Sequence, residues 1–91
     1  MKEAYQLAQG AMASLKSSVY LLLQGSPDGL TNAAIGRSLG IYSGHVRHQG
    51  HISRTILALM EAEGVVEQDS VTKAWTLRRH AADAKDHQEQ E

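Results

Sequence analysis

Residues 30–41 read LTNAAIGRSLGI and residues 52–66 read ISRTILALMEAEGVV, and the fold depends on these two stretches. In the first stretch, the hydroxyl of Thr31 is placed to cap a helix over residues 32–39. Gly40 follows that helix, and a residue without a Cβ readily adopts the left-handed conformation in which many helices end. The first stretch therefore predicts a short helix with a defined start and stop.

The second stretch predicts a longer helix over residues 51–63, which ends at Gly64. Its large apolar side chains recur at helical spacing, and we expect these four to face inward: Ile52, Ile56, Leu59 and Met60. The segment before this helix has two open interpretations. Ser43 could cap a helix that continues through Gly50, or residues 42–50 could form an irregular loop.

Residues 3–24 precede these helices and carry apolar side chains every three or four positions, which predicts one long amphipathic helix. Gly10 weakens the middle of this segment, so a break into two helices there is the alternative. The sequence GSPDG at residues 25–29 is rich in turn-forming residues and ends that helix. After Gly64 the apolar period becomes strand-like, and residues 65–69 and 73–78 predict an antiparallel hairpin. Alternation along its second strand turns two large side chains toward the core, Trp75 and Leu77.

The chain has 91 residues, of which 42% are hydrophobic and none is cysteine. This length corresponds to one small domain, which we expect to span residues 1–80, followed by a disordered acidic tail over residues 81–91. The lack of cysteine excludes disulfides, thiol catalysis and cysteine-based zinc sites. The longest apolar run, residues 19–23, is far shorter than the roughly 20 residues that cross a bilayer, so we expect a cytoplasmic protein without membrane contact.

The formal net charge of −1 hides an uneven distribution of charged residues. Residues 29–60 contain three arginines, three histidines and no acidic residue, whereas residues 81–91 contain four acids and one lysine. A basic stretch without acids is the electrostatic pattern expected of a surface that binds a polyanion.

The predicted order of a long helix, two further helices and a hairpin resembles the winged helix-turn-helix superfamily. Residues 30–41 are similar to its LT-x-x-x-[IL]-[AG]-x-x-L-G-[IL] stretch, and residues 52–66 resemble its recognition helix running into the wing, as in MarR-like bacterial regulators. The resemblance covers about residues 12–78 and implies a mainly α fold, with three helices and a two-stranded antiparallel wing, in a DNA-binding transcriptional regulator. Residues 42–50 depart from that pattern by an insertion of about six residues.

If the helix over residues 51–63 enters the major groove, outward side chains near its start meet the base edges. We expect Ser53 and Arg54 to project outward, where Arg54 can bind guanine bidentately; the alternative is a solvated arginine without a partner. The hairpin would reach the DNA backbone, although its mixed charges could equally form surface salt bridges. The predicted DNA-binding residues are Thr31, Ser43, His45, Arg47, His48, Gln49, His51, Ser53, Arg54 and Lys73.

The first helix is longer than a winged domain needs, because residues 12–24 suffice to cover the core. Its extra turns expose an apolar stripe, from which we predict a homodimer through this helix. The predicted contact residues are Tyr5, Leu7, Ala8 and Met12. In the alternative, the extra turns fold back onto the chain's own core.

The sequence contains no paired carboxylates, no nucleophile with a base and no glycine-rich phosphate loop, so we expect no enzyme activity and no cofactor. His45, His48 and His51 recur every three residues, but residues 29–60 lack the carboxylates that would complete a zinc site, and we expect no metal.

An alternative interpretation keeps the same fold but gives the chain another function. The chain would then be a protein–protein interaction module or a DNA-targeting accessory of a restriction or mobile-element system.

Overall fold

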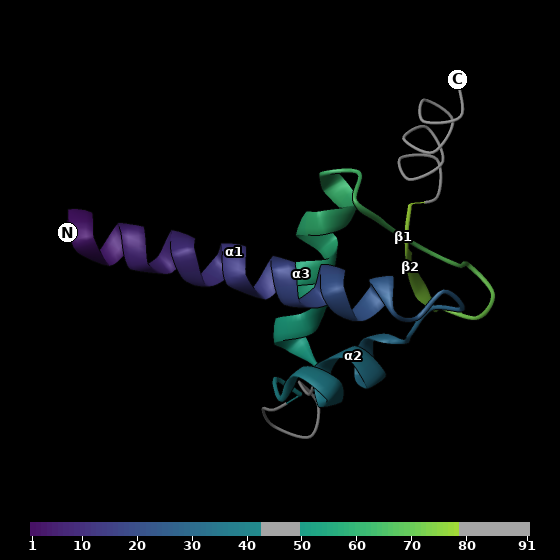
Figure 1. Cartoon of the computed structure of the whole chain (residues 1–91). Coiled ribbons are helices and arrows are strands. Elements are labelled where there is room, and N and C mark those ends of the chain that lie inside the picture. The colour runs from purple at the N-terminus through teal and green to yellow at the C-terminus, as the bar shows by residue number, and fades with distance from the viewer. Residues whose placement is uncertain (43–49, 79–91) are drawn as a thin grey trace.

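α1 spans Lys2–Gln24 and is the longest element of the computed structural model, which describes residues 1–42 and 50–78. The prediction of one long first helix is confirmed. Its second half contributes two buried side chains to the core, whereas every residue from 1 to 11 is exposed. Residues 1–11 project from the rest of the domain as an arm, drawn in purple in Figure 1. The alternative in which these turns fold back onto the core is therefore wrong.

α2 spans Asn32–Leu39, and both of its ends are built as the sequence predicts. The Thr31 hydroxyl accepts a hydrogen bond from the backbone N–H of Ala34 at 3.2 Å, which satisfies one of the free donors at the helix start. Gly40 has a φ of 74°, and its N–H donates to the carbonyl of Arg37. The helix therefore ends at this residue, which has the left-handed conformation typical of a helix C-terminus.

α3 spans His51–Ala62 and begins directly after Gly50, which has a φ of 79°. A left-handed residue does not fit inside a regular right-handed helix. The interpretation in which one helix continues through Gly50 is therefore wrong. Residues 43–49, including the predicted cap Ser43, lie outside the described residues.

The buried face of α3 is rotated by about 65° from the expected one, at 100° per residue. Its buried residues are Ser53, Ile56, Leu57 and Met60. Ile52 is 42% exposed and Leu59 also lies at the surface, so the expectation that both face inward is wrong. The buried set forms one continuous stripe along a helix of 3.6 residues per turn, and Ile52 and Leu59 lie on the flank of that stripe.

The hairpin consists of β1 (Val66–Gln68) and β2 (Trp75–Leu77), which pair antiparallel with Val66 opposite Leu77. Leu30, in the connection between α1 and α2, forms two backbone hydrogen bonds with Trp75, of 3.0 and 2.7 Å. β2 therefore lies between β1 and Leu30, and the sheet ties the α1–α2 connection to the hairpin.

The core lies between the three helices and the sheet. Its buried hydrophobic residues are Val19, Leu23, Ile35, Ile56, Leu57, Met60, Val66 and Trp75. Leu77 packs partly against them, so the prediction that Trp75 and Leu77 face the core is confirmed. The described residues form a mainly helical fold with a two-stranded antiparallel hairpin, which confirms the predicted class of mainly α with a hairpin.

The predicted domain boundary at residue 80 and the acidic tail over residues 81–91 lie outside the described residues. Within residues 1–42 and 50–78, no helix combines the length and the apolar character that crossing a membrane requires.

Candidate nucleic-acid interface

A partly buried hydrogen-bond network holds the start of α3 against the start of α2. The Ser53 hydroxyl donates to Oδ1 of Asn32 at 2.8 Å, and Nδ2 of Asn32 donates to the carbonyl of Gly50 at 3.1 Å. Ser53 has a relative exposure of 0%, so the expectation that it projects toward DNA is wrong. Its hydroxyl finds a hydrogen-bond partner in another helix, and this pairing allows a polar side chain to be buried at that position.

Tyr42 packs into the angle between the same two helices. A Cβ added to Gly36 would lie 3.0 Å from the Tyr42 side chain, and one added to Gly50 would lie 2.8 Å from its ring. The ring therefore occupies space that two residues without side chains leave open. We refer to the surface around this ring as the α2–α3 corner, and define it by Arg37, Tyr42, Gly50, His51 and Arg54.

Arg37 lies over the Tyr42 ring. Its guanidinium carbon is 4.6 Å from the ring centroid, which is within the range of a cation–π contact. The Arg37 side chain is otherwise exposed. The predicted set of DNA-binding residues omits Arg37, although its position in the acid-free stretch over residues 29–60 is a signal that points to it.

The first turn of α3 exposes polar and basic side chains. His51, Arg54 and Thr55 are exposed, which agrees with the expected outward orientation of Arg54. No acidic residue lies in this turn, and the N–H groups of a helix start carry partial positive charge. At the opposite end of α3, Glu63 forms a 2.6 Å salt bridge with Lys16 of α1. The start of α3, where the N–H groups carry this partial positive charge, is therefore the end that lies at the α2–α3 corner.

Five of the predicted DNA-binding residues lie outside the described residues: Ser43, His45, Arg47, His48 and Gln49. Among the others, His51 and Arg54 lie in the corner. Thr31 is exposed and caps α2 directly before Asn32, which is hydrogen-bonded to the start of α3. Sequence reasoning therefore found two exposed residues at the start of α3, His51 and Arg54, and the cap of α2, and it missed Arg37 and Tyr42.

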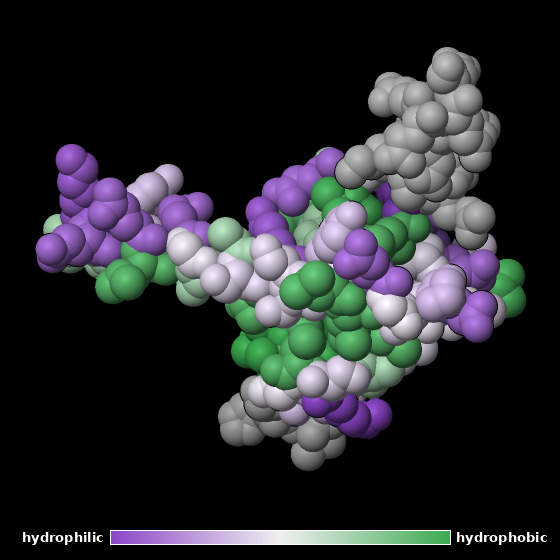
Figure 2. All heavy atoms as spheres, in the orientation of Figure 1, coloured by the Kyte–Doolittle hydropathy of each residue, from purple (hydrophilic) through white to green (hydrophobic). Residues whose placement is uncertain are grey.

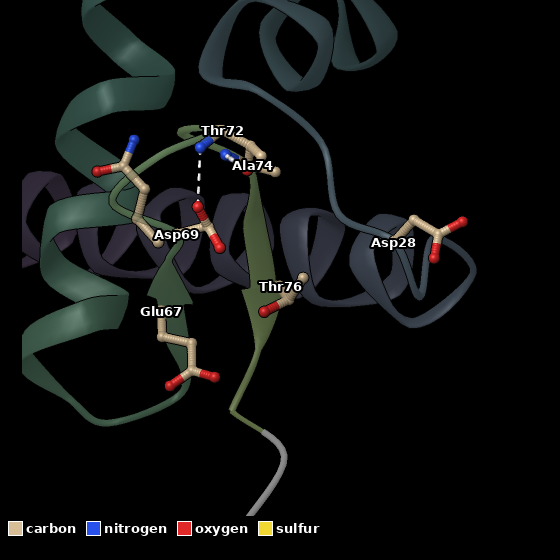
Figure 3. Close-up of a pocket in the computed structure, with 7 residues that line it drawn as sticks. Asp28, Glu67, Asp69, Thr72, Ala74 and Thr76 are labelled. Atoms are coloured by element: carbon tan, nitrogen blue, oxygen red, sulfur yellow. Dashed lines mark hydrogen bonds between the residues drawn. The ribbon is translucent and has the colours of Figure 1, made fainter.

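The turn between β1 and β2 does not bring Lys73 to the corner. Lys73 has a φ of 67° within this turn, which Figure 1 places away from the start of α3. A pocket beside the turn is lined by three carboxylates, from Asp28, Glu67 and Asp69 (Figure 3). The backbone N–H groups of Thr72 and Val71 donate to Asp69 and lower the pKa of its carboxyl below the ordinary value. This surface carries more acid than base.

Comparisons with known protein families, with curated proteins and with solved structures found no match for this chain. Within the part of the chain that the structure describes, no three histidine or acidic side chains are arranged to hold a metal ion. The function is therefore inferred from the α2–α3 corner, a basic surface at the positive end of an exposed helix.

Proposed function

We propose that this chain is a winged helix-turn-helix protein that binds double-stranded DNA and regulates transcription. The order of elements supports the fold assignment. The pairing of Leu30 with Trp75 also supports it, because Leu30 lies beside β2 in the place of a third strand. One observation carries the function: basic side chains gather at the positive end of α3, in a stretch of sequence without acids. Phosphates and base edges are the partners that such a surface fits.

In this proposal α3 lies in the major groove, with its first turn toward the base edges. Arg54 projects from that turn, where an arginine can bind O6 and N7 of guanine through two hydrogen bonds. His51 and Thr31 lie near the edge of the groove and contact phosphates. The hairpin contributes less than the corner, because the carboxylates beside Lys73 repel phosphates.

Binding of a mixed-sequence DNA duplex is expected to weaken steeply as salt rises. About four phosphate contacts give a log–log slope near −3.6, which is a loss of affinity of about 150-fold between 50 and 200 mM salt. Fluorescence anisotropy with a labelled duplex measures this slope. Absence of binding at about 50 mM salt, where phosphate contacts are strong, would contradict the proposal.

Arg54→Ala is expected to weaken duplex binding at least about fivefold, because it removes a charged, bidentate group from the turn that meets the groove. Lys2→Ala is the matched control. It removes the same charge from an exposed position on the arm and should change the affinity less than about twofold. Equal effects of the two substitutions would show that net charge alone drives binding and that α3 is not the contact.

A protein–protein interaction module is the second candidate function, and one observation favours it. Ile52 and Leu59 are exposed apolar side chains on α3, the helix proposed to meet DNA. A protein partner would cover them, and its binding would change little with salt. The salt titration therefore distinguishes the two candidates.

We also propose that a second copy of this chain binds the arm. Leu7 is 77% exposed, and residues 4–15 contain no charged side chain. Figure 2 shows apolar atoms on one side of the arm and a larger apolar area on the domain beside it. A helical segment of about ten residues without packing partners is marginal in water, and an uncharged face can pair with its own copy without repulsion. Met12 contributes less to this contact than Leu7, because it packs partly on the core.

Ala8→Glu is expected to convert a dimer into a monomer, because it places a charge within the apolar stripe that continues from the core-facing side of α1. Gln6→Glu is the matched control, since two residues at 100° each turn its side chain to the opposite side of the helix. Light scattering coupled to size exclusion measures the mass of each variant. A monomeric wild-type chain, or equal dissociation by both substitutions, would be inconsistent with the proposed contact.

A further inference from the structure

The guanidinium group of Arg37 is positioned by an aromatic ring. It lies over Tyr42 with its carbon 4.6 Å from the ring centroid. A cation–π contact occupies no hydrogen-bond acceptor, so the N–H donors of the guanidinium remain available to another group. Among the described residues the one ion pair joins Lys16 to Glu63, so Arg37 has no carboxylate partner there.

The Tyr42 ring is in turn held by the start of α3. A Cβ on Gly50 would lie 2.8 Å from the ring and 2.6 Å from Nδ2 of Asn32, so these three residues are in close contact. The Asn32 amide also donates to the Gly50 carbonyl at 3.1 Å. Arg37 and the residue that precedes α3 therefore contact the same aromatic ring.

We infer that Arg37 binds a phosphate of the DNA backbone at the edge of the groove that α3 enters, and that Tyr42 positions it. This inference rests on the proposed function and adds a contact to the same surface. Arg37 extends from α2, beside the helix proposed to fill the groove, and the sugar–phosphate backbone runs along the edge of that groove. The fork of a guanidinium group matches two phosphate oxygens. Stacking on Tyr42 restricts a long side chain before binding, which reduces the entropy lost when the contact forms.

Arg37→Ala tests this inference in the full chain with a labelled mixed-sequence duplex. Loss of one phosphate contact reduces the magnitude of the log–log salt slope by about 0.9. The fold-loss of affinity between 50 and 200 mM salt should therefore be about 3.5 times smaller for the variant than for the wild type. Lys2→Ala, on the arm, should leave the slope unchanged.

The outcomes separate this inference from the proposed function. A salt-dependent wild type whose slope is unchanged by Arg37→Ala would overturn the inference and leave DNA binding in place. A wild type that does not bind DNA would remove both. The expected result is a shallower slope for Arg37→Ala together with an unchanged slope for Lys2→Ala.

The positioning role of Tyr42 is tested by a double-mutant cycle. Tyr42→Leu should weaken DNA binding in the wild-type background and have little effect in the Arg37→Ala background, because the ring acts through the guanidinium. Tyr42→Phe keeps the ring and should bind as the wild type does. Full additivity of Arg37→Ala and Tyr42→Leu, or a loss of binding in Tyr42→Phe equal to that in Tyr42→Leu, would overturn this role. Circular dichroism of each variant confirms that the comparison is made between folded chains.

Discussion

Gly50→Ala is expected to lower the free energy of unfolding by about 3 kcal/mol, because two unfavourable effects add at this position. Gly50 has a φ of 79°, a conformation that is strained for a residue with a Cβ. The new Cβ would also lie 2.6 Å from Nδ2 of Asn32 and 2.8 Å from the Tyr42 ring, so both side chains would have to move. Equilibrium unfolding in urea measures the change.

Gly40→Ala is the matched control for this substitution. Gly40 has a similar φ of 74°, and apart from its two chain neighbours no described residue has an atom within 4 Å of an added Cβ. Backbone strain alone should then destabilise the protein by about 1 kcal/mol. Equal effects at Gly50 and Gly40 would show that the corner tolerates an extra methyl group, and the packed arrangement of Asn32, Tyr42 and Gly50 would be wrong.

Gly50→Ala should also weaken DNA binding more than Gly40→Ala does. Gly50 joins the start of α3 to Asn32 and Tyr42, so a shift there changes how Arg37 and Arg54 are presented. Anisotropy titrations of both variants, at a temperature where each is folded, measure this difference. An unchanged affinity for Gly50→Ala would indicate that DNA binding, if observed, does not use the α2–α3 corner.

Trp75→Ala is expected to cost about 3–5 kcal/mol, the range found when a large buried aromatic side chain is truncated. Trp75 is a core residue of β2, and its backbone also pairs with Leu30. A chain of this size is stable by roughly 5–10 kcal/mol, so the variant should retain little stability. Thermal unfolding followed by circular dichroism should show Tm lowered by at least about 15 °C.

Val71→Ala is the control for truncation in the same hairpin. Val71 is 86% exposed in the turn between β1 and β2, and its loss should change stability by less than about 0.5 kcal/mol. A small effect of Trp75→Ala, comparable with that of Val71→Ala, would contradict the placement of Trp75 in the core.

The sequence alone predicted the elements and most of their ends, because the signals for these features are local, and it left the start of α3 open. Thr31 caps the helix that it precedes, and Gly40 has the left-handed conformation that its place after an apolar period predicts. Alternation of Trp75 with its neighbours identified the inward face of the second strand. The exposure of Arg54 was also predictable from its position near the start of a helix.

The tertiary structure decided which face of α3 is buried and how the corner is assembled. The apolar periodicity located this face only approximately, since the expected and the buried faces of α3 differ by about 65°. The burial of Ser53 depends on Asn32, a hydrogen-bond partner 21 residues away in the sequence. No local pattern of α3 shows that partner, which is why Ser53 was expected at the surface and Ile52 in the core.

Contacts between distant residues also decided which charged side chains lie close together. Asp28 and Glu67 are far apart in the sequence, and the pairing of Leu30 with Trp75 holds the α1–α2 connection against the hairpin, where the two carboxylates line one pocket. Arg37 and Tyr42 are close in the sequence, but only the tertiary structure brings Gly50 against the same ring. Local sequence thus determined the helices, their caps and the hairpin, whereas contacts between distant residues decided which side chains form the candidate DNA-binding surface.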